Sequence, residues 1–409
     1  MQYLPRLAET KTRKLARLFK VVLVTGARQV GKSTLLKHLF PDHRVIVFDP
    51  VQDIHGARQD PDLFLDSFPA PLILDEIQYA PELLPAIKRR VDLSPECGQY
   101  LLTGSQNLGL LKSVSESLAG RVGIVDLAPM TCWELDQISP DRCWLPHFLD
   151  ESDRLLAAHS RESAPLHQRI WRGGMPGLIP FADSELPDYF RAYVQTYVER
   201  DVLTLQNIRD MQLFDRFLGL MAALTSQEIN ASQLGRDIGV SPRIARTWLD
   251  LLKTANQWWE VPPYHGNTIK RISGKWKGYI TDTGLGCWLQ RLQSSESLIG
   301  SPLLGALFET MVTASIRQQS LLLPTEPASW HWRTAAGAEV DLLLEYGGTF
   351  YPIEIRAKTN PSGHDARGII AFRKTYPKLK TGTGLIVCAG KETRWVSNGV
   401  LAIPWDLSI

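Results

Sequence analysis

The chain has 409 residues, of which 44% are hydrophobic and 22% are charged, and its formal net charge is +2. It is long enough to bury the cores of two or three globular domains. No apolar run is long enough to cross a bilayer, and the charged N-terminal segment lacks the apolar core of a secretory signal, so we expect a cytoplasmic protein without membrane contact. The five cysteines contain no CxxC pair, so we expect neither a disulfide framework nor a zinc ribbon.

Short apolar runs alternate with helix-like stretches in the first 130 residues. Each run is rich in Val, Ile and Leu, and continuous apolar runs of this length are typical of strands buried on both faces of a parallel sheet. We therefore predict a doubly wound α/β domain over residues 1–130. Its predicted strands are 21–26, 45–48, 71–76, 99–104 and 121–127.

The stretch GARQVGKST, residues 26–34, directly follows the first of these strands and opens a helix. It fits the pattern GxxxxGK[ST], whose glycines let the backbone fold around an anion with its N–H groups pointing inward. The lysine of this pattern reaches the β- and γ-phosphates, and the hydroxyl that follows binds Mg²⁺. We therefore predict a site for ATP and Mg²⁺ that consists of Gly26, Ala27, Arg28, Gln29, Val30, Gly31, Lys32, Ser33 and Thr34, in which Lys32 is also a catalytic residue.

The segment PLILDEIQ places Asp75 and Glu76 where an apolar strand ends. A carboxylate at the carboxyl end of a strand lies in the crevice where α/β sheets bind ligands, so Asp75 is the second candidate ligand of Mg²⁺. Glu76 is the candidate base that activates water, which predicts hydrolysis of ATP in addition to binding. An acidic pair at a strand end can also be no more than a turn.

Two further polar positions are candidates for the same site. Ser105, with Thr103 and Gln106 beside it, ends the strand QYLLTGSQ and is predicted to orient the attacking water, although a strand-end serine is often only a cap. Arg121 stands before the last strand of the domain. It is predicted to reach the γ-phosphate of its own or of a neighbouring subunit's ATP, which would imply self-association. The alternative for Arg121 is a surface salt bridge.

The middle of the chain is predicted to contain a helical lid or linker region, 131–230, and a winged helix-turn-helix, 231–300. In the second unit, ASQLGRDIG and the stretch from 241 to 257 are two helices joined by a glycine turn. The second helix would be the recognition element and the basic segment after it the wing. We therefore expect DNA as a partner, with docking to another protein as the alternative. The candidate nucleic-acid contacts are Arg243, Arg246, Lys270, Arg271, Lys275 and Lys277.

The segments TGARQVGKSTLL, LILDEIQ, LLTGSQN and SLAGRV together resemble a prokaryotic family of AAA-type ATPases whose C-terminal half is a domain of unknown function. Later segments, among them YVERDV, KGYITDTGL, GALFETMV and WRTAAGAEVDLLLE, also resemble this family. The resemblance covers nearly the whole chain. It implies a P-loop domain, a winged-helix segment and a restriction-endonuclease-like α/β domain, here 301–409.

A hairpin in this last domain carries acidic residues. If Gly347 and Gly348 form a two-residue turn, Asp341 faces Glu354, Glu339 faces Arg356, and an apolar set forms the opposite face. Carboxylates about 5 Å apart repel by about 3 kcal/mol at an effective dielectric constant of 20, so a metal, a shared proton, or the cation of Arg356 or Lys358 must lie nearby. The apolar set is Val340, Leu342, Leu344, Tyr351, Ile353 and Ile355.

Nucleases of the restriction-endonuclease class place one acid on a strand, the sequence E-x-K on the next strand, and another acid on a preceding helix. The matching candidate metal ligands here are Asp341, Glu354 and Glu309, but Arg356 stands at the lysine position. Arginine stays protonated and favours bidentate pairing with a carboxylate over activation of water. We therefore predict an Mg²⁺-dependent ATPase coupled to DNA binding or processing; the alternative is a nucleotide-controlled signalling or scaffolding switch with an inactive nuclease-like domain.

Overall fold

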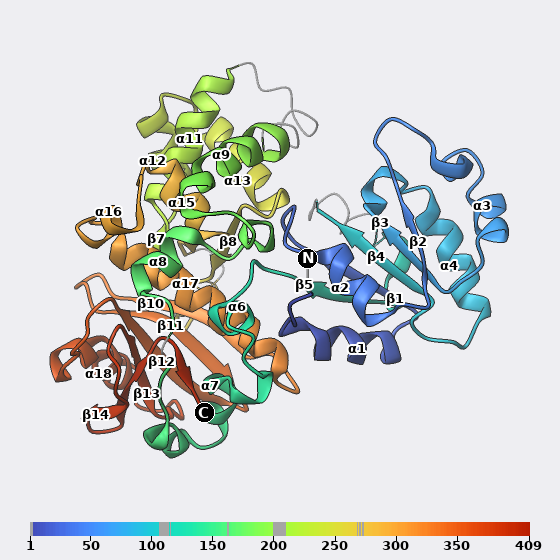
Figure 1. Ribbon diagram of the computed structural model, residues 1–409. Coiled ribbons are helices and arrows are strands. Elements are labelled where there is room, and N and C mark those ends of the chain that lie inside the picture. The colour runs from blue at the N-terminus through green and yellow to red at the C-terminus, as the bar shows by residue number, and fades with distance from the viewer. Residues whose placement is uncertain are drawn as a thin grey trace.

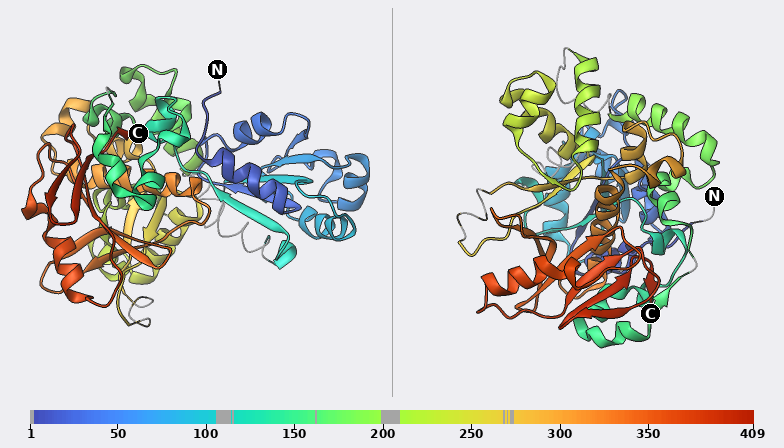
Figure 2. Two further views of the ribbon diagram at one scale, coloured as in Figure 1. Left: turned by 90° about the horizontal axis from the view of Figure 1, so that it is seen from below. Right: turned by 90° about the vertical axis from the view of Figure 1, so that its left-hand side faces the viewer.

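The computed structural model describes residues 3–105, 114, 116–161, 163–198, 210–267, 269, 271 and 274–409. Figure 1 shows the N-terminal domain in blue and cyan on the right and the rest of the chain on the left. In the left view of Figure 2 the N-terminal sheet and the C-terminal sheet again lie at opposite ends of the molecule. None of the described helices has both the length and the apolar composition that crossing a bilayer requires.

The N-terminal domain is the predicted parallel α/β sheet, with the strand order β2-β3-β4-β1-β5. Both faces of the central strands β1, β3 and β4 are buried. In β1, Val21 and Leu23 pack against α3 and α4, whereas Val22 and Val24 pack against α1 and α2. This explains why the strands are continuous apolar runs. The elements are α1 (Ala8–Leu18), β1 (Val21–Thr25), α2 (Lys32–Leu39), β2 (Arg44–Val47), α3 (Pro61–Ser67), β3 (Leu72–Asp75), α4 (Leu83–Leu93), β4 (Tyr100–Gly104) and β5 (Val122–Asp126).

The middle of the chain is mainly helical. Its helices α12 and α13 are joined through Gly239, which has a left-handed backbone (φ 87°), and Ser241 caps α13 by accepting the N–H of Ile244. In the chain they lie between β7 and β8 of the antiparallel sheet β7-β9-β8, and α13 packs against β8. The elements are α8 (Leu166–Arg172), α9 (Leu186–Tyr193), α11 (Met211–Ala223), β7 (Gln227–Glu228), α12 (Ala231–Ile238), α13 (Pro242–Thr254), β8 (Trp258–Val261), β9 (Lys277–Ile280), α15 (Thr283–Leu289) and α16 (Ser295–Ile299).

The C-terminal part is built on a mixed six-stranded sheet with the order β10-β11-β12-β13-β15-β14. Helix α17 packs against β12, and α18 packs against β11 and β12. The elements are α17 (Leu304–Gln319), β10 (Ala328–Arg333), β11 (Glu339–Tyr346), β12 (Thr349–Arg356), α18 (Arg367–Thr375), β13 (Gly384–Cys388), β14 (Arg394–Ser397), β15 (Val400–Pro404) and β16 (Leu407–Ser408).

The predicted hairpin register is confirmed from the turn to Leu342, which pairs with Ile353. Gly347 and Gly348 both have positive φ, as the two-residue turn requires. One detail of the prediction is wrong: Val340 does not share a face with Leu342 but belongs to a different core cluster. The reason is a bulge, because Asp341 and Leu342 together lie opposite the single residue His331 of β10.

The first part of the predicted region 131–230 packs on the C-terminal part of the chain. The backbone N–H of Leu145 donates to Gln319 of α17, and Ser160 pairs with Leu407. The elements involved are α6 (Cys132–Leu135), α7 (Trp144–Asp150) and β6 (His159–Ser160), and Figure 1 shows α7 beside the C-terminus.

Candidate active site

The phosphate loop connects β1 to α2 at the carboxyl edge of the N-terminal sheet. Gly26 and Gly31 have φ angles of 146° and 93°, and a Cβ at Gly26 would lie 2.2 Å from the carbonyl oxygen of Leu127. Both glycines are therefore required by the backbone. Lys32 is buried, and its Nζ donates to the carbonyl oxygens of Gly26 (3.0 Å) and Ala27 (2.9 Å), so the ammonium lies inside the loop.

Three side chains from α2, β3 and β4 meet beside this loop. The hydroxyl of Ser33 donates to Oδ1 of Asp75 at 2.5 Å, and the hydroxyl of Thr103 donates to the same oxygen. Strand β4 lies between β1, which leads into the phosphate loop, and β3, which ends at Asp75, so Thr103 is next to both. A hydroxyl and a carboxylate are the hard oxygen ligands that Mg²⁺ prefers, and this pair fits the predicted ion.

Glu76 follows Asp75 with a left-handed backbone (φ 59°), which is uncommon for a residue other than glycine. Its backbone N–H donates to Thr103 Oγ1 at 3.0 Å, and its Oε2 accepts from Ser105 Oγ at 3.2 Å and from Gln78 Nε2. The structure thus brings together the predicted base and the predicted polar residue of β4. Gln106 lies outside the described residues.

Arg6 also contacts this site, although no motif in the sequence singles it out. It is 4% exposed, and its guanidinium donates to the carbonyl oxygens of Val30 (2.7 Å) and Ala128 (2.7 Å) and to Oε1 of Glu134 (2.9 Å). The arginine therefore links the phosphate loop to the segment that leaves the N-terminal domain. No sequence pattern relates Arg6 to a loop 24 residues later.

The middle of the chain also contacts the nucleotide-binding domain at this edge. Tyr189 donates its hydroxyl to Gln29, Tyr193 donates to the carbonyl oxygen of Arg28 at 3.4 Å, and Asn256 donates to the carbonyl oxygen of Ser105 at 3.1 Å. Arg28 itself donates to the hydroxyl of Tyr79 at 2.8 Å. The phosphate loop and the end of β4 are therefore both in contact with the middle of the chain.

The predicted contact of Arg121 with the ATP of its own subunit is wrong. Arg121 precedes β5, and its carbonyl oxygen accepts the N–H of Val21 at the start of β1, so it lies at the sheet edge opposite the phosphate loop. A five-residue strand spans roughly 13 Å. The guanidinium instead forms a bidentate salt bridge with Asp92, at 2.5 and 3.0 Å.

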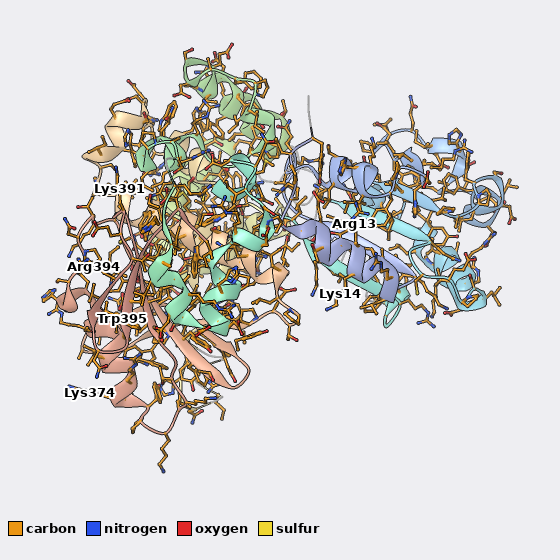
Figure 3. All side chains as sticks on the ribbon, turned by 60° about the horizontal axis from the view of Figure 1, so that its bottom comes forward. Arg13, Lys14, Lys374, Lys391, Arg394 and Trp395 are labelled. Carbon is orange, nitrogen blue, oxygen red and sulfur yellow. The ribbon has the colours of Figure 1, made fainter. Side chains whose placement is uncertain are left out.

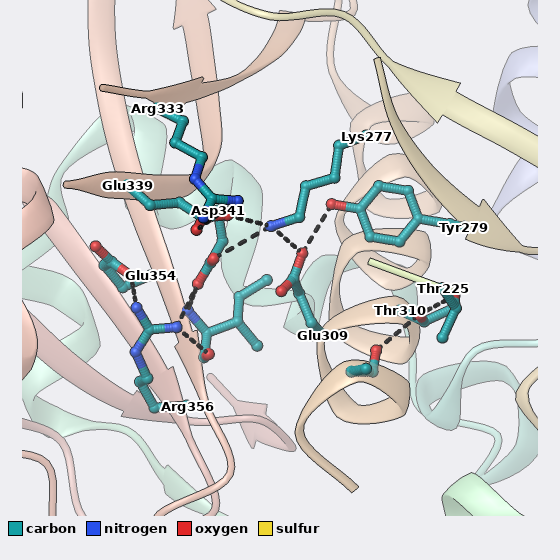
Figure 4. Close-up of polar contacts among 12 residues, drawn as sticks. Thr225, Lys277, Tyr279, Glu309, Thr310, Arg333, Glu339, Asp341, Glu354 and Arg356 are labelled. Atoms are coloured by element: carbon teal, nitrogen blue, oxygen red, sulfur yellow. Dashed lines mark hydrogen bonds and ion pairs between the residues drawn. The ribbon is translucent and has the colours of Figure 1, made fainter. Parts of the chain in front are cut away.

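A second polar cluster lies where β9, α17 and β11 meet (Figure 4). Lys277 of β9 is 2% exposed, and its Nζ lies 2.7 Å from Oε1 of Glu309, 2.9 Å from Oε1 of Glu339 and 3.3 Å from Oδ1 of Asp341. Glu309 also accepts the hydroxyl of Tyr279 at 2.9 Å. The prediction that Lys277 contacts DNA is therefore wrong, because the ammonium is buried among carboxyl groups.

Arg356 neutralises the other side of this cluster. It donates to Oδ2 of Asp341 at 2.8 Å and to Oε2 of Glu354, so the cation of Arg356, one of the expected alternatives, lies beside these carboxyl groups. Lys358 does not join the cluster. Strand β12 ends at Arg356, and the ammonium of Lys358 pairs with Asp365 at 2.6 Å. Glu339 contacts Lys277 where pairing with Arg356 was predicted.

Burial and neighbouring charges shift the acid–base properties of the cluster. Burial lowers the pKa of Lys277, but the carboxyl groups around it outweigh burial and hold that pKa well above its ordinary value. Burial opposes ionisation of Asp341, yet Lys277 and Arg356 keep its pKa below the ordinary value. Burial raises the pKa of Glu309 to about 8, and burial beside Asp341 raises that of Glu354 well above its usual range. The positive charge in the cluster thus comes from two side chains.

The predicted metal ligands Asp341, Glu354 and Glu309 do not fit a divalent ion in this arrangement. Among the residues that the structure describes, no three or more His, Cys, Asp or Glu side chains are arranged as a metal site. A divalent ion 4 Å from the Lys277 ammonium would be repelled by roughly 8 kcal/mol at an effective dielectric constant of 20. The charges that such an ion would balance are already paired.

The other residues predicted to contact nucleic acid differ in their surroundings. Arg243 and Arg246 are exposed near the N-terminal end of α13, and Lys275 is exposed before β9. Arg271 lies 4.3 Å over the ring of Tyr264 and donates to the carbonyl oxygen of His265. Lys270 lies outside the described residues.

Three family models match successive parts of this chain. Residues 18–135 match an AAA domain, residues 163–296 a domain of unknown function (DUF8612), and residues 304–407 a domain of unknown function (DUF4143). Uncharacterized proteins of Mycobacterium tuberculosis and Mycobacterium bovis are each 30% identical over 98% of this chain and 83% of their own length. The chain belongs to this family of AAA-type P-loop ATPases. The N-terminal match includes the phosphate loop and Asp75 of this ATPase, and the C-terminal match includes the carboxylate cluster.

Solved structures resemble the ATPase at lower similarity. The Walker-type ATPase of Pyrococcus abyssi is 20% identical over 70% of this chain and 96% of its own, with a TM-score of 0.39. The RuvB Holliday junction branch migration motor of Thermotoga maritima is 19% identical over 68% of this chain and 92% of its own, with a TM-score of 0.31. At these values neither likeness supports an argument about substrate or partner.

Proposed function

We propose that this protein binds ATP with Mg²⁺ at the phosphate loop and hydrolyses it, with Glu76 as the base. The observation that carries the proposal is the convergence of the Ser33 hydroxyl on Asp75 at 2.5 Å, with Glu76 adjacent and oriented by Thr103. A hydroxyl, a carboxylate and a second carboxylate at one sheet edge are the set that phosphoryl transfer to water needs.

Each side chain of the site has a distinct role in this proposal. Lys32 and the backbone N–H groups of residues 26–33 bind the phosphates, and Ser33 and Asp75 hold Mg²⁺, which neutralises charge on the phosphate oxygens. Glu76 accepts the proton of the attacking water. Ser105 and Gln78, both bonded to Oε2 of Glu76, orient this carboxylate.

Two substitutions test the assignment. Lys32→Ala is expected to lose ATP binding, whereas Glu76→Gln is expected to keep ATP affinity within a few-fold and to lower turnover about 100-fold or more. The assays are calorimetric ATP titration and phosphate release. Turnover of Glu76→Gln at the wild-type rate would remove Glu76 as the base, and absence of nucleotide binding by the wild type would remove the proposal.

We further propose that the nucleotide cycle is coupled to the C-terminal half, with DNA as the partner. The contacts of Tyr189, Tyr193 and Asn256 with the nucleotide-binding edge support the coupling. The exposed arginines of α13 support DNA as the partner. If α12, α13 and their adjoining strands form a winged helix, these arginines would enter a groove of DNA. Figure 3 labels further basic and aromatic side chains along one side of the C-terminal part of the chain: Lys374, Lys391, Arg394 and Trp395.

The second candidate function is a nucleotide-controlled switch that binds a protein partner and cuts nothing. Burial of Lys277 among the nuclease-like acids favours this candidate over an ATP-regulated nuclease. ATP turnover measured with and without duplex DNA at low salt separates the two proposals. DNA coupling predicts stimulation that Arg243→Ala with Arg246→Ala abolishes; a rate insensitive to DNA, with no retention on duplex, leaves the switch.

A further inference from the structure

The carboxyl groups of the nuclease-like cluster surround an ammonium in the way that they would surround a metal. Lys277 carries three N–H donors, and three carboxyl oxygens, from Glu309, Glu339 and Asp341, lie within 3.3 Å of its Nζ. We infer that Lys277 permanently occupies the cation position of this cluster, so that the wild-type C-terminal domain takes up no divalent metal there and cuts no phosphodiester by a metal-dependent route.

Both carboxyl oxygens of Asp341 already accept hydrogen bonds from the protein. Its Oδ1 accepts from Lys277, while its Oδ2 accepts from the backbone N–H of Ile355 and from Arg356, both at 2.8 Å. The N–H of Ile355 donates to this side chain beyond the point where the pairing of β11 with β12 ends, at Leu342 and Ile353. Backbone geometry therefore directs the central carboxylate toward two side-chain cations.

The cluster joins two parts of the fold, because Lys277 and the carboxyl groups around it come from different elements. Lys277 lies on β9, whose partners are β7 and β8, whereas Glu309 lies on α17 and Asp341 on β11 (Figure 4). A second contact supports the same junction: His331 Nε2 lies 3.0 Å from the carbonyl oxygen of Lys275. Because the lysine is supplied by another unit of the fold, the three-stranded sheet and the C-terminal sheet are expected to move as one body.

The wild-type protein tests the metal claim directly. The number of Mn²⁺ ions bound without nucleotide is measured by electron paramagnetic resonance for the wild type and for Asp341→Asn. The substitution leaves the phosphate-loop site intact. We expect equal Mn²⁺ stoichiometry; one additional Mn²⁺ in the wild type overturns the inference. Cleavage by bound Fe²⁺ with ascorbate, mapped by mass spectrometry on the wild type, needs no variant. Cuts around residues 339–341 or 354 overturn the inference, and their absence supports it.

The lysine is tested by Lys277→Met, with Lys275→Met as the matched control because Lys275 is exposed two residues earlier. Lys277→Met is expected to lower the melting temperature by about 5–10 °C and to gain a Mn²⁺ site, since three carboxyl groups lose their cation. The control is expected to change neither value. Equal melting temperatures, or no gain of Mn²⁺ by a folded Lys277→Met, overturn the inference. ATP turnover is measured in parallel, so failure of the proposed ATPase is recognised separately.

Discussion

Replacement of Arg6 by Met is expected to destabilise the protein and to loosen the phosphate loop. Arg6 is 4% exposed and Glu134 is 2% exposed, so the substitution leaves a buried carboxylate without its cation. Breaking a buried pair in this way costs about 3–5 kcal/mol. We expect the lower end, about 3 kcal/mol, because Glu134 still accepts the backbone N–H groups of Leu7 (2.8 Å) and Thr131 (2.7 Å).

The assay is urea unfolding followed by circular dichroism, with Arg17→Met as the control. Arg17 lies on α1, the helix that follows Arg6 in the chain, and is exposed. Calorimetric titration is expected to show roughly tenfold weaker ATP binding for Arg6→Met, about 1.4 kcal/mol, since Val30 loses the donor that fixes its carbonyl. If Arg6→Met unfolds within about 0.5 kcal/mol of the control, the argument that Arg6 holds the loop is refuted.

Three further outcomes are expected. Thr103→Val removes the hydroxyl that positions Asp75 and Glu76, and should lower ATP turnover roughly 10- to 100-fold in steady-state assays. Burial lowers the pKa of His331 to about 4, whereas the imidazole of the unfolded chain is protonated near its ordinary pKa of 6.5. The free energy of unfolding is therefore fully retained above pH 6.5 and falls by up to about 3 kcal/mol as the pH is lowered toward 4. In urea unfolding at these pH values, His331→Gln should lose less stability than the wild type. Subunits with Arg121→Ala mixed with subunits with Lys32→Ala should regain ATP turnover if Arg121 acts across an interface, and a mixture without activity removes that role.

Features encoded by neighbouring residues could be predicted from the sequence. The phosphate loop depends on two glycines of the same short loop. The register of the C-terminal hairpin depends on Gly347 and Gly348, whose positive φ angles fix the turn. The central strands of the N-terminal sheet are recognisable as continuous apolar runs because both of their faces are buried. In each case the information lies within about ten residues of the feature that it determines.

Features that depend on long-range contacts could not be predicted. Lys277 looks like a surface residue of a basic segment, and only its position opposite Asp341, 64 residues later, shows that it is buried. The bulge at Asp341 has no glycine to mark it, because it arises from pairing with His331 on β10. Arg6 is similar, since its partner Glu134 is 128 residues away.

Helix α17 connects the two sites that the sequence presents as separate. Arg317, near its C-terminal end, pairs with Asp126 at the end of β5, and Glu309, eight residues earlier and therefore about 12 Å away, belongs to the carboxylate cluster. Just beyond the helix, Leu321 is buried in the core of the N-terminal domain. A movement of β5 during the nucleotide cycle would thus be passed along one rigid helix to the cluster. Because Lys277 fixes the cluster to β9, we expect that movement to displace the three-stranded sheet together with the C-terminal sheet, and the adjustment to occur at the contacts of Tyr189, Tyr193 and Asn256 with the nucleotide-binding edge.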